Sequence, residues 1–216
     1  MIDLHTHTLL SDGVLVPSEL IRRARVIGYA AIAITDHADE SNIESVLEQI
    51  RKVTVLYNSA ASFKAVPGVE LTHIPPCRIP SMVERARSLG ARIVVGHGET
   101  LSEPVERGTN MAFIKARVDT LAHPGLVTAA HCREAAKKRV FLEITSRHGH
   151  ASSNGHVAAM AIRHGAPLVI NSDAHGPGDL ISANAAINVA LGAGLSIKDF
   201  RRMQKNAEAI VKKALS

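Results

Sequence analysis

Residues 2–13 of the chain read Ile2-Asp3-Leu4-His5-Thr6-His7-Thr8-Leu9-Leu10-Ser11-Asp12-Gly13. The apolar start predicts a buried β-strand that ends in two histidines. Side chains two positions apart on a strand point to the same face and lie about 7 Å apart. Two neutral imidazoles placed in this way can chelate one metal ion. Gly13 permits a turn with positive φ, and Asp12 offers a carboxylate beside the same spot, so the segment predicts the beginning of a metal site.

Outward from this segment, aliphatic runs alternate with amphipathic helical segments. Six more strands are expected at 30–35, 65–71, 92–96, 118–122, 140–144 and 167–171, and capping boxes at Ser41–Glu44 and Ser81–Glu84 are expected to open two of the helices. Strands buried on both faces read as continuous aliphatic runs, and helical crossovers join parallel strands. Seven such strands predict an α/β fold in which a barrel-like parallel sheet is wrapped by helices. A doubly wound open sheet is less favoured because no glycine-rich phosphate loop follows the first strand.

Composition predicts a globular protein. The chain has 216 residues, of which 46% are hydrophobic, and we expect one domain over 1–216 with closing helices at about 183–214 packed on the barrel. The longest apolar run, 30–34, is too short for a membrane span, and no signal segment fits before Ile2, so we expect a cytoplasmic protein without membrane contact. Cys77 and Cys132 have no metal-like spacing and are expected to be free thiols.

The net charge of +5 favours anionic partners. Lysine and arginine are spread over the expected helix faces, and aromatic residues make up only 3% of the chain, without tryptophan. The chain therefore offers few aromatic side chains on which the bases of a single-stranded nucleic acid could stack. We expect a small anionic phosphorylated substrate, with nucleic acid as the second choice.

Acids and histidines follow the expected strands at six of their seven ends. Because the carboxyl ends of parallel barrel strands share one rim, these side chains should converge there. Burying so many unpaired polar groups would be costly without a bound metal. The predicted metal ligands are His5, His7, Asp12, His37, Glu70, His97, His123, Asp173 and His175. Asp36 adjoins His37 on the opposite face of its strand and is expected to act as a hydrogen-bond partner behind the ligands.

The remaining candidates lie in loops and helices. Arg147 is the leading candidate for a bidentate phosphate contact and Arg107 the second, although either could equally pair with a surface acid. His73, His148 and His150 lie in expected rim loops and are weaker candidates for substrate contact, while His131, His156 and His164 lie in expected helices and fit surface or packing positions.

The sequence resembles the PHP (polymerase and histidinol phosphatase) family of metal-dependent phosphoesterases. The matching motifs are His5-Thr6-His7 with Ser11-Asp12-Gly13, Ile34-Thr35-Asp36-His37, Pro67-Gly68-Val69-Glu70, His97, Ala122-His123-Pro124-Gly125 and Ser172-Asp173-Ala174-His175. The resemblance implies a distorted (β/α)7 TIM-like barrel with a trinuclear site. It would place one metal on His5, His7, Glu70 and Asp173, a second on His97, His123 and the bridging Glu70, and a third on Asp12, His37 and His175.

Imidazole and carboxylate ligands without thiolate suit two or three ions of Zn, Mn or Fe. We expect a metal-bound hydroxide to attack phosphorus without a protein nucleophile. The expected activity is hydrolysis of a small phosphomonoester, similar to histidinol phosphate. A nucleotide or nucleic-acid phosphohydrolase of the same family and an amidohydrolase-type metal enzyme are the alternatives. The pattern does not select the metal, the natural substrate, the oligomeric state or the roles of loops 72–80, 98–110 and 145–152.

Overall fold

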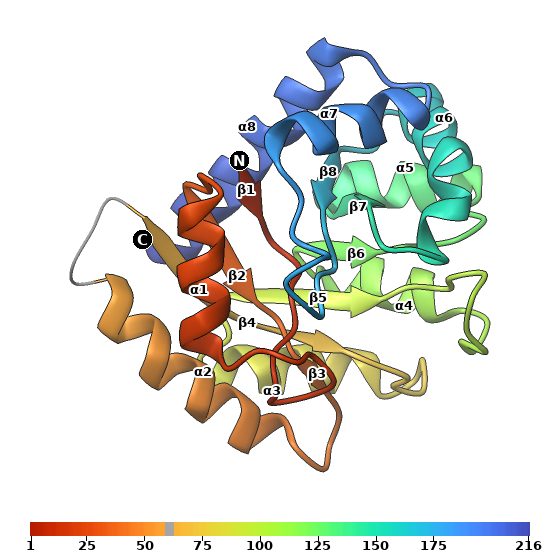
Figure 1. Cartoon of the computed structure of the whole chain (residues 1–216). Helices are drawn as coiled ribbons and strands as arrows, with labels where there is room; N and C mark the ends of the chain where they lie inside the picture. Colours follow the sequence, from red (N-terminus) through yellow and green to blue (C-terminus); the bar gives the residue numbers. More distant parts are fainter. Residues whose placement is uncertain (59–62) are drawn as a thin grey trace.

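The computed structural model describes residues 1–58 and 63–216 and is built around parallel strands (Figure 1). The strands are β1 (Ile2–Asp3), β2 (Ala31–Ile34), β3 (His37–Ala38), β4 (Lys64–Leu71), β5 (Ile93–His97), β6 (Thr120–Ala122), β7 (Phe141–Thr145) and β8 (Leu168–Asn171). They pair in the order β1-β2-β4-β5-β6-β7-β8, and the short β3 pairs with β4 beyond the end of β2. All pairings are parallel. The result is a nearly closed seven-stranded barrel.

The barrel closes where the segment after β1 meets the segment after β8. Thr6 forms a parallel bridge with Ala174, and the amide of Asp173 donates to the carbonyl of His5 at 3.0 Å. Nearer the other end of this seam, Asn171 replaces the backbone ladder, because its side-chain oxygen accepts from the amide of Leu4 at 2.9 Å. Hydrogen bonds therefore join the first and last strands of the barrel next to the predicted site.

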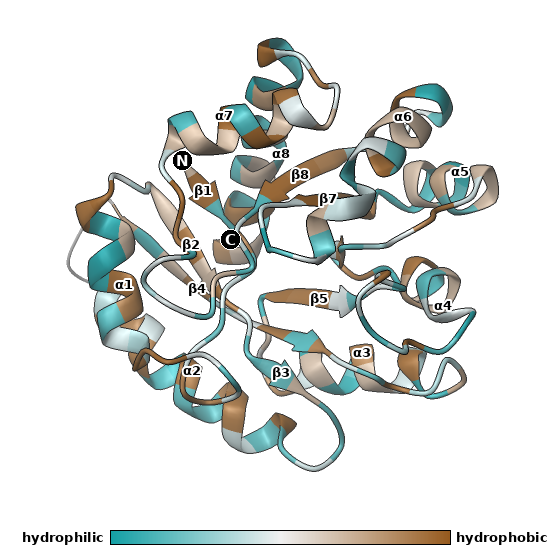
Figure 2. Ribbon diagram, turned by 45° about the vertical axis from the view of Figure 1, so that its right-hand side comes forward, coloured by the Kyte–Doolittle hydropathy of each residue, from teal (hydrophilic) through white to brown (hydrophobic). Residues whose placement is uncertain are grey.

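Helices surround the strands. They are α1 (Pro17–Val26), α2 (Ile43–Asn58), α3 (Ile79–Ser88), α4 (Thr109–Ala116), α5 (Ala129–Lys138), α6 (Asn154–His164), α7 (Ala183–Gly192) and α8 (Ile197–Leu215), with a 3-10 turn at His150–Ser153. Figure 2 shows hydrophobic strands inside and helices with hydrophilic residues along their length. Two buried apolar clusters lie between the strands and these helices. No helix of the described chain is both long and apolar enough to cross a membrane.

A third apolar cluster fills the barrel interior and extends onto α8. Leu4, Val66 and Val95 face inward and share this cluster with Ile210 and Val211 of the helix. The helix is anchored to the strands by side-chain hydrogen bonds: Gln204 accepts from the amide of Ile2 at 2.8 Å, and Asn206 donates to the carbonyl of Leu168 at 2.8 Å. The amino-terminal end of the barrel is thus packed by α8, and the carboxyl end is left for polar side chains.

The predicted α/β barrel with seven wrapped strands is confirmed, with local differences. The chain bends at Thr35 and Asp36, so the second predicted strand continues as the separate β3. Ser196 and Asp199 form the capping box of α8, but the boxes predicted at Ser41 and Ser81 are absent. The Ser41 hydroxyl instead donates to Asp39, and α3 already begins at Ile79. Both cysteines are free, as expected, with Cys77 exposed and Cys132 buried.

Candidate metal centre

The nine predicted ligands converge on the carboxyl-terminal rim of the barrel, and Glu70 lies at their centre. This carboxylate, near the end of β4, is fully buried. Its Oε2 lies 3.2 Å from Nε2 of His5 and 3.5 Å from Nε2 of His7, and its Oε1 lies 3.2 Å from Nδ1 of His97 and 3.5 Å from Nε2 of His123. Nδ1 of His37 lies closer still, 2.9 Å from Oε2, so one carboxylate faces five imidazoles from four other strands or their extensions.

Asp173 completes the deep part of the cluster from the opposite side. Its Oδ1 lies 3.3 Å from Nε2 of His7 and 3.7 Å from Nε2 of His5, and its Oδ2 lies 3.8 Å from Nε2 of His123. Burial raises the pKa of this carboxyl group. In contrast, burial of Glu70 is outweighed by the neighbouring His5, His37 and His97 rings, which hold its pKa well below the usual value.

A second, more open group lies at the mouth of the site. Asp12 has a side chain that is 55% exposed; its Oδ2 lies 3.6 Å from Nε2 of His37, and its Oδ1 lies 3.2 Å from Nε2 of His175. The His175 ring stacks on that of His7 with 4.1 Å between ring centroids. His7 thus joins the buried and open groups. A cavity of about 270 Å³, lined in part by His37 and His73, opens beside them.

Many nitrogen and oxygen atoms of this cluster lack hydrogen-bond partners, as expected for metal ligands without their ions. Buried side-chain atoms normally have hydrogen-bond partners. In the described chain, seven buried atoms of this cluster have none: Nε2 of His5, both ring nitrogens of His7, both oxygens of Glu70, Nδ1 of His97 and Nδ1 of His123. Several sets of three or four of these side chains bring one donor atom each within 4.8 Å of one another, among them His7, Asp12, His37 and His175, and His5, His123 and Asp173. Divalent ions would satisfy these donors.

Two carboxylates that the sequence did not single out as site residues support the histidines from behind. Glu143 of β7 is fully buried, and its Oε2 lies 2.9 Å from Nδ1 of His5 and accepts from the Asn171 amide at 2.8 Å. Glu103, in the loop after β5, lies 2.9 Å from Nε2 of His97. The hydrogen bond to His97 is the main cause that lowers the pKa of Glu103 to about 2. A carboxylate on the far nitrogen of a ligating histidine orients the ring.

The turn that carries His7 and Asp12 is held by Asp36. The Asp36 carboxylate accepts from the Thr8 amide at 2.7 Å and from the Ser11 hydroxyl at 2.7 Å. Asp36 therefore faces this turn, and His37 faces the cluster. The role of Gly13 differs from the prediction: its φ is not positive, and a Cβ atom there would come within 2.6 Å of the His7 carbonyl. Close backbone approach, rather than a left-handed conformation, requires glycine.

Backbone strain is present at two of the nine residues. His123 has φ of 27° and Asp173 has φ of 54°, both in the region that favours glycine. Such conformations cost on the order of 1 kcal/mol each and collect at functional sites. His73 also has a positive φ, of 52°, and its Nε2 lies 3.3 Å from Glu103.

The other candidate residues have varied environments. Nη1 of Arg147 lies 3.1 Å from Oδ2 of Asp179, which also accepts from the amides of His175 and Gly176 at 3.0 and 2.8 Å. Arg147 thus braces the turn that carries His175. Arg107 is exposed on the loop before α4.

The histidines outside the nine also differ. The His150 ring stacks on His123 with 4.3 Å between centroids, and its Nε2 lies 3.4 Å from Glu103. His131 caps α5, and Nε2 of His156 lies 2.8 Å from the carbonyl of Val127.

Comparison with known proteins identifies the family. The model of the PHP domain matches residues 3–166. The chain belongs to the PHP domain family. This PHP-domain chain is 49% identical over 202 residues to the uncharacterized protein MJ1295 of Methanocaldococcus jannaschii, covering 91% of each chain. It is 36% identical over 132 residues to the 5'-3' exoribonuclease Rnm of Escherichia coli; the match covers 59% of this chain and only 41% of that relative.

Solved structures share the fold. The PHP-domain chain resembles a chain in an archaeal ribonuclease P with mature tRNA, with a TM-score of 0.75 and 16% identity, covering 99% of this chain and 91% of that one. It resembles the histidinol phosphate phosphatase of Lactococcus lactis, a complex with zinc, L-histidinol and phosphate, with a TM-score of 0.62 and 15% identity over 95% and 93% of the two chains. At these identities the likeness concerns the fold alone.

Proposed function

We propose that this chain is a metal-dependent phosphoesterase that hydrolyses the phosphate ester of a small molecule, of the histidinol-phosphate kind. The observation that carries the proposal is the set of seven buried nitrogen and oxygen atoms that lack partners and converge on the barrel rim. Membership of a family of metal-dependent phosphoesterases favours phosphoester chemistry over the amidohydrolase alternative.

We assign the buried residues to two metal ions and the more exposed residues to a third. We assign His5, His7, Glu70 and Asp173 to one ion and His97 and His123, with Glu70 shared, to a second. A third ion would lie at the mouth on Asp12, His37 and His175. When bound, two or three ions of Zn, Mn or Fe would polarise the phosphate oxygens and acidify the attacking water. No protein nucleophile is required, and we assign none.

Side chains around the proposed ligands hold them in position. Glu143 holds His5, Glu103 holds His97, and Asp36 holds the turn that carries His7. We assign a phosphate contact first to Arg147, because Asp179 fixes its guanidinium at the rim, and second to Arg107. We place the small ester in the cavity that His37 and His73 line in part, beside the open group.

A second candidate activity is hydrolysis of nucleic-acid ends. The identity with the exoribonuclease Rnm, which extends over 59% of this chain, favours it. The low aromatic content argues against it, because stacking of bases on aromatic rings is a major term in binding single strands.

A phosphate-release panel on metal-loaded protein tests the two activities side by side. The panel contains histidinol phosphate, nucleoside monophosphates and 5'-labelled oligoribonucleotides, and the metal content of each preparation is measured. We expect release from the small phosphomonoesters, its loss on chelation and its return with added metal. Faster degradation of the oligonucleotides would favour the second activity, and a metal-replete protein that is inert on the whole panel would contradict both.

A further inference from the structure

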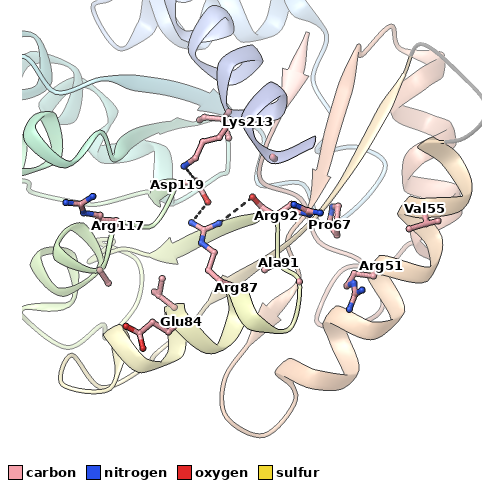
Figure 3. Close-up of a pocket in the computed structure, with 15 residues that line it drawn as sticks. Arg51, Val55, Pro67, Glu84, Arg87, Ala91, Arg92, Arg117, Asp119 and Lys213 are labelled. Atoms are coloured by element: carbon pink, nitrogen blue, oxygen red, sulfur yellow. Dashed lines mark hydrogen bonds and ion pairs between the residues drawn. The ribbon is translucent and has the colours of Figure 1, made fainter. Parts of the chain in front are cut away.

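Figure 3 shows the residues that line a second cavity, of about 900 Å³. It lies at the opposite end of the barrel from the histidines and is larger than the cavity of about 270 Å³ beside His37. It is bounded by α2, α3, α4, α8, β4 and the segment that precedes β5. Its volume falls in the range of ligand-binding pockets, which is about 300–1,000 Å³. This cavity has no part in the proposed phosphoesterase reaction.

Positive charge dominates its walls. The lining includes five cationic side chains and two acidic ones; the cations are Arg51, Arg87, Arg92, Arg117 and Lys213. One of the two acids, Asp119, already has hydrogen-bond and ion-pair partners within the protein. It accepts from Nη2 of Arg87 at 2.6 Å and from the Val94 amide at 2.9 Å, and Nζ of Lys213 lies 3.7 Å away (Figure 3). With Glu84 also counted, the lining holds three more cationic than acidic side chains.

Arg92 and Arg117 are the cations without partners. Within residues 1–58 and 63–216, neither guanidinium group has an ion pair or a side-chain hydrogen bond, and both residues are exposed. Arg117 also has φ of 61°, in the left-handed region where glycine is favoured. Arg117 is the C-cap of α4, and helices commonly end in a left-handed residue, so its side chain leaves the helix end beside the cavity.

Helix dipoles explain part of this charge but not all of it. Cations are favoured at helix carboxyl ends, which accounts for Arg87 in the last turn of α3 and Lys213 in the last turn of α8. Arg51 lies within α2, and Arg92 directly precedes β5. Nη1 of Arg51 donates to the carbonyl of Leu89, the C-cap of α3, at 3.1 Å, so the carboxyl end of that helix accounts for Arg51 as well but not for Arg92.

We propose that this cavity binds an anion that carries several phosphate groups. Guanidinium groups bind phosphate through paired, charge-assisted hydrogen bonds, and Arg92 and Arg117 have their donors available. None of the described residues that line the cavity is aromatic, so recognition would rest on phosphates and not on base stacking. A free oligophosphate and the backbone of a short RNA share this chemistry. This site is separate from the catalytic rim, so the ligand bound here would regulate the protein or anchor it and would not be hydrolysed.

Isothermal titration of the full, metal-containing chain with tripolyphosphate tests the site. The double variant R92A/R117A removes the two free guanidinium groups. Arg139→Ala is the matched control, because Arg139 also ends a helix with a positive φ, of 57°, is exposed, and does not line the cavity. Chelation of metals at the rim by the probe contributes equally to all three proteins and cancels in the comparison.

We expect the wild-type chain and Arg139→Ala to bind alike and R92A/R117A to bind at least about tenfold more weakly, with unchanged thermal unfolding. A parallel titration with a five-nucleotide RNA identifies the source of the phosphates. Tighter binding of the RNA that depends on the same two arginines assigns a nucleotide chain, and a preference for tripolyphosphate assigns a free oligophosphate. Equal affinities of the double variant and Arg139→Ala, or no binding by the wild type, would overturn the proposal whether or not the rim hydrolyses phosphoesters.

Discussion

The two ends of the barrel differ in what their side chains leave unsatisfied. At the carboxyl end, buried nitrogen and oxygen atoms converge without partners, and the backbone is strained at His123 and Asp173. At the amino end, aliphatic side chains fill the interior and pack on α8. Strand β5 shows the contrast within five residues, since Ile93 lies in the apolar interior and His97 lies in the cluster. We expect stability and metal binding to be separated along this strand, so that each end can be altered and tested on its own.

Replacing Glu70 with Gln should produce the largest effect and should be confined to the rim. The variant removes the charge shared by the proposed ions, and loss of a metal's contribution of several kcal/mol predicts at least a ~1000-fold decrease in kcat. The metal content, measured by elemental analysis, should fall as well. Arg139→Ala serves as the control and should retain both. Near-normal turnover with full metal content would show that Glu70 is not the centre of the site.

Replacing Ile93 with Ala tests the opposite end. Ile93 is fully buried in the barrel interior, and truncation of such a side chain costs about 2–5 kcal/mol of the free energy of unfolding. Urea denaturation should show this loss while metal stoichiometry stays unchanged. Ile162→Ala, at a side chain that is 54% exposed, should change stability by less than about 0.5 kcal/mol. Loss of metal together with stability in Ile93→Ala would show that the two ends are not separable.

Replacing Glu143 with Gln should weaken the rim without dismantling it. The amide can still accept a hydrogen bond from His5, but the charge behind the ring is lost, and metal affinity should fall about 10–100-fold. Competition with a chromophoric chelator measures the change. Glu106→Gln, at an exposed glutamate in the loop before α4, is the control. An unchanged affinity would limit Glu143 to a packing role.

Replacing Arg147 should have the smallest effect of the four. We expect Arg147→Ala to raise KM for a phosphomonoester about tenfold through loss of a charge-assisted phosphate contact. Asp179→Asn separates this role from bracing, because Asp179 holds both Arg147 and the His175 turn. If the two variants show the same kinetics, Arg147 acts only on the turn.

The sequence predicted the barrel and the nine rim residues because strand parity and strand ends are local properties. Side chains that follow the ends of parallel strands must meet, whatever the loops do. Glu143 lies inside an aliphatic strand. A charged residue at such a position indicates a functional or supporting role, but none was assigned to it from the sequence. Glu103 could not be found in this way, because the path of the loop after β5 is set by tertiary contacts. The capping boxes at Ser41 and Ser81 failed because nearby turns determined where those helices begin.

The seam between β1 and β8 gives the barrel a further property. His5 and His7 approach it from one side and Asp173 and His175 from the other, and only a few main-chain bonds join the two sides. Cations bound across the seam would act as a clasp, since the free energy that holds them also opposes parting of the first and last strands. During folding, the clasp cannot form before the last strand docks, so metal capture would report that the barrel has closed.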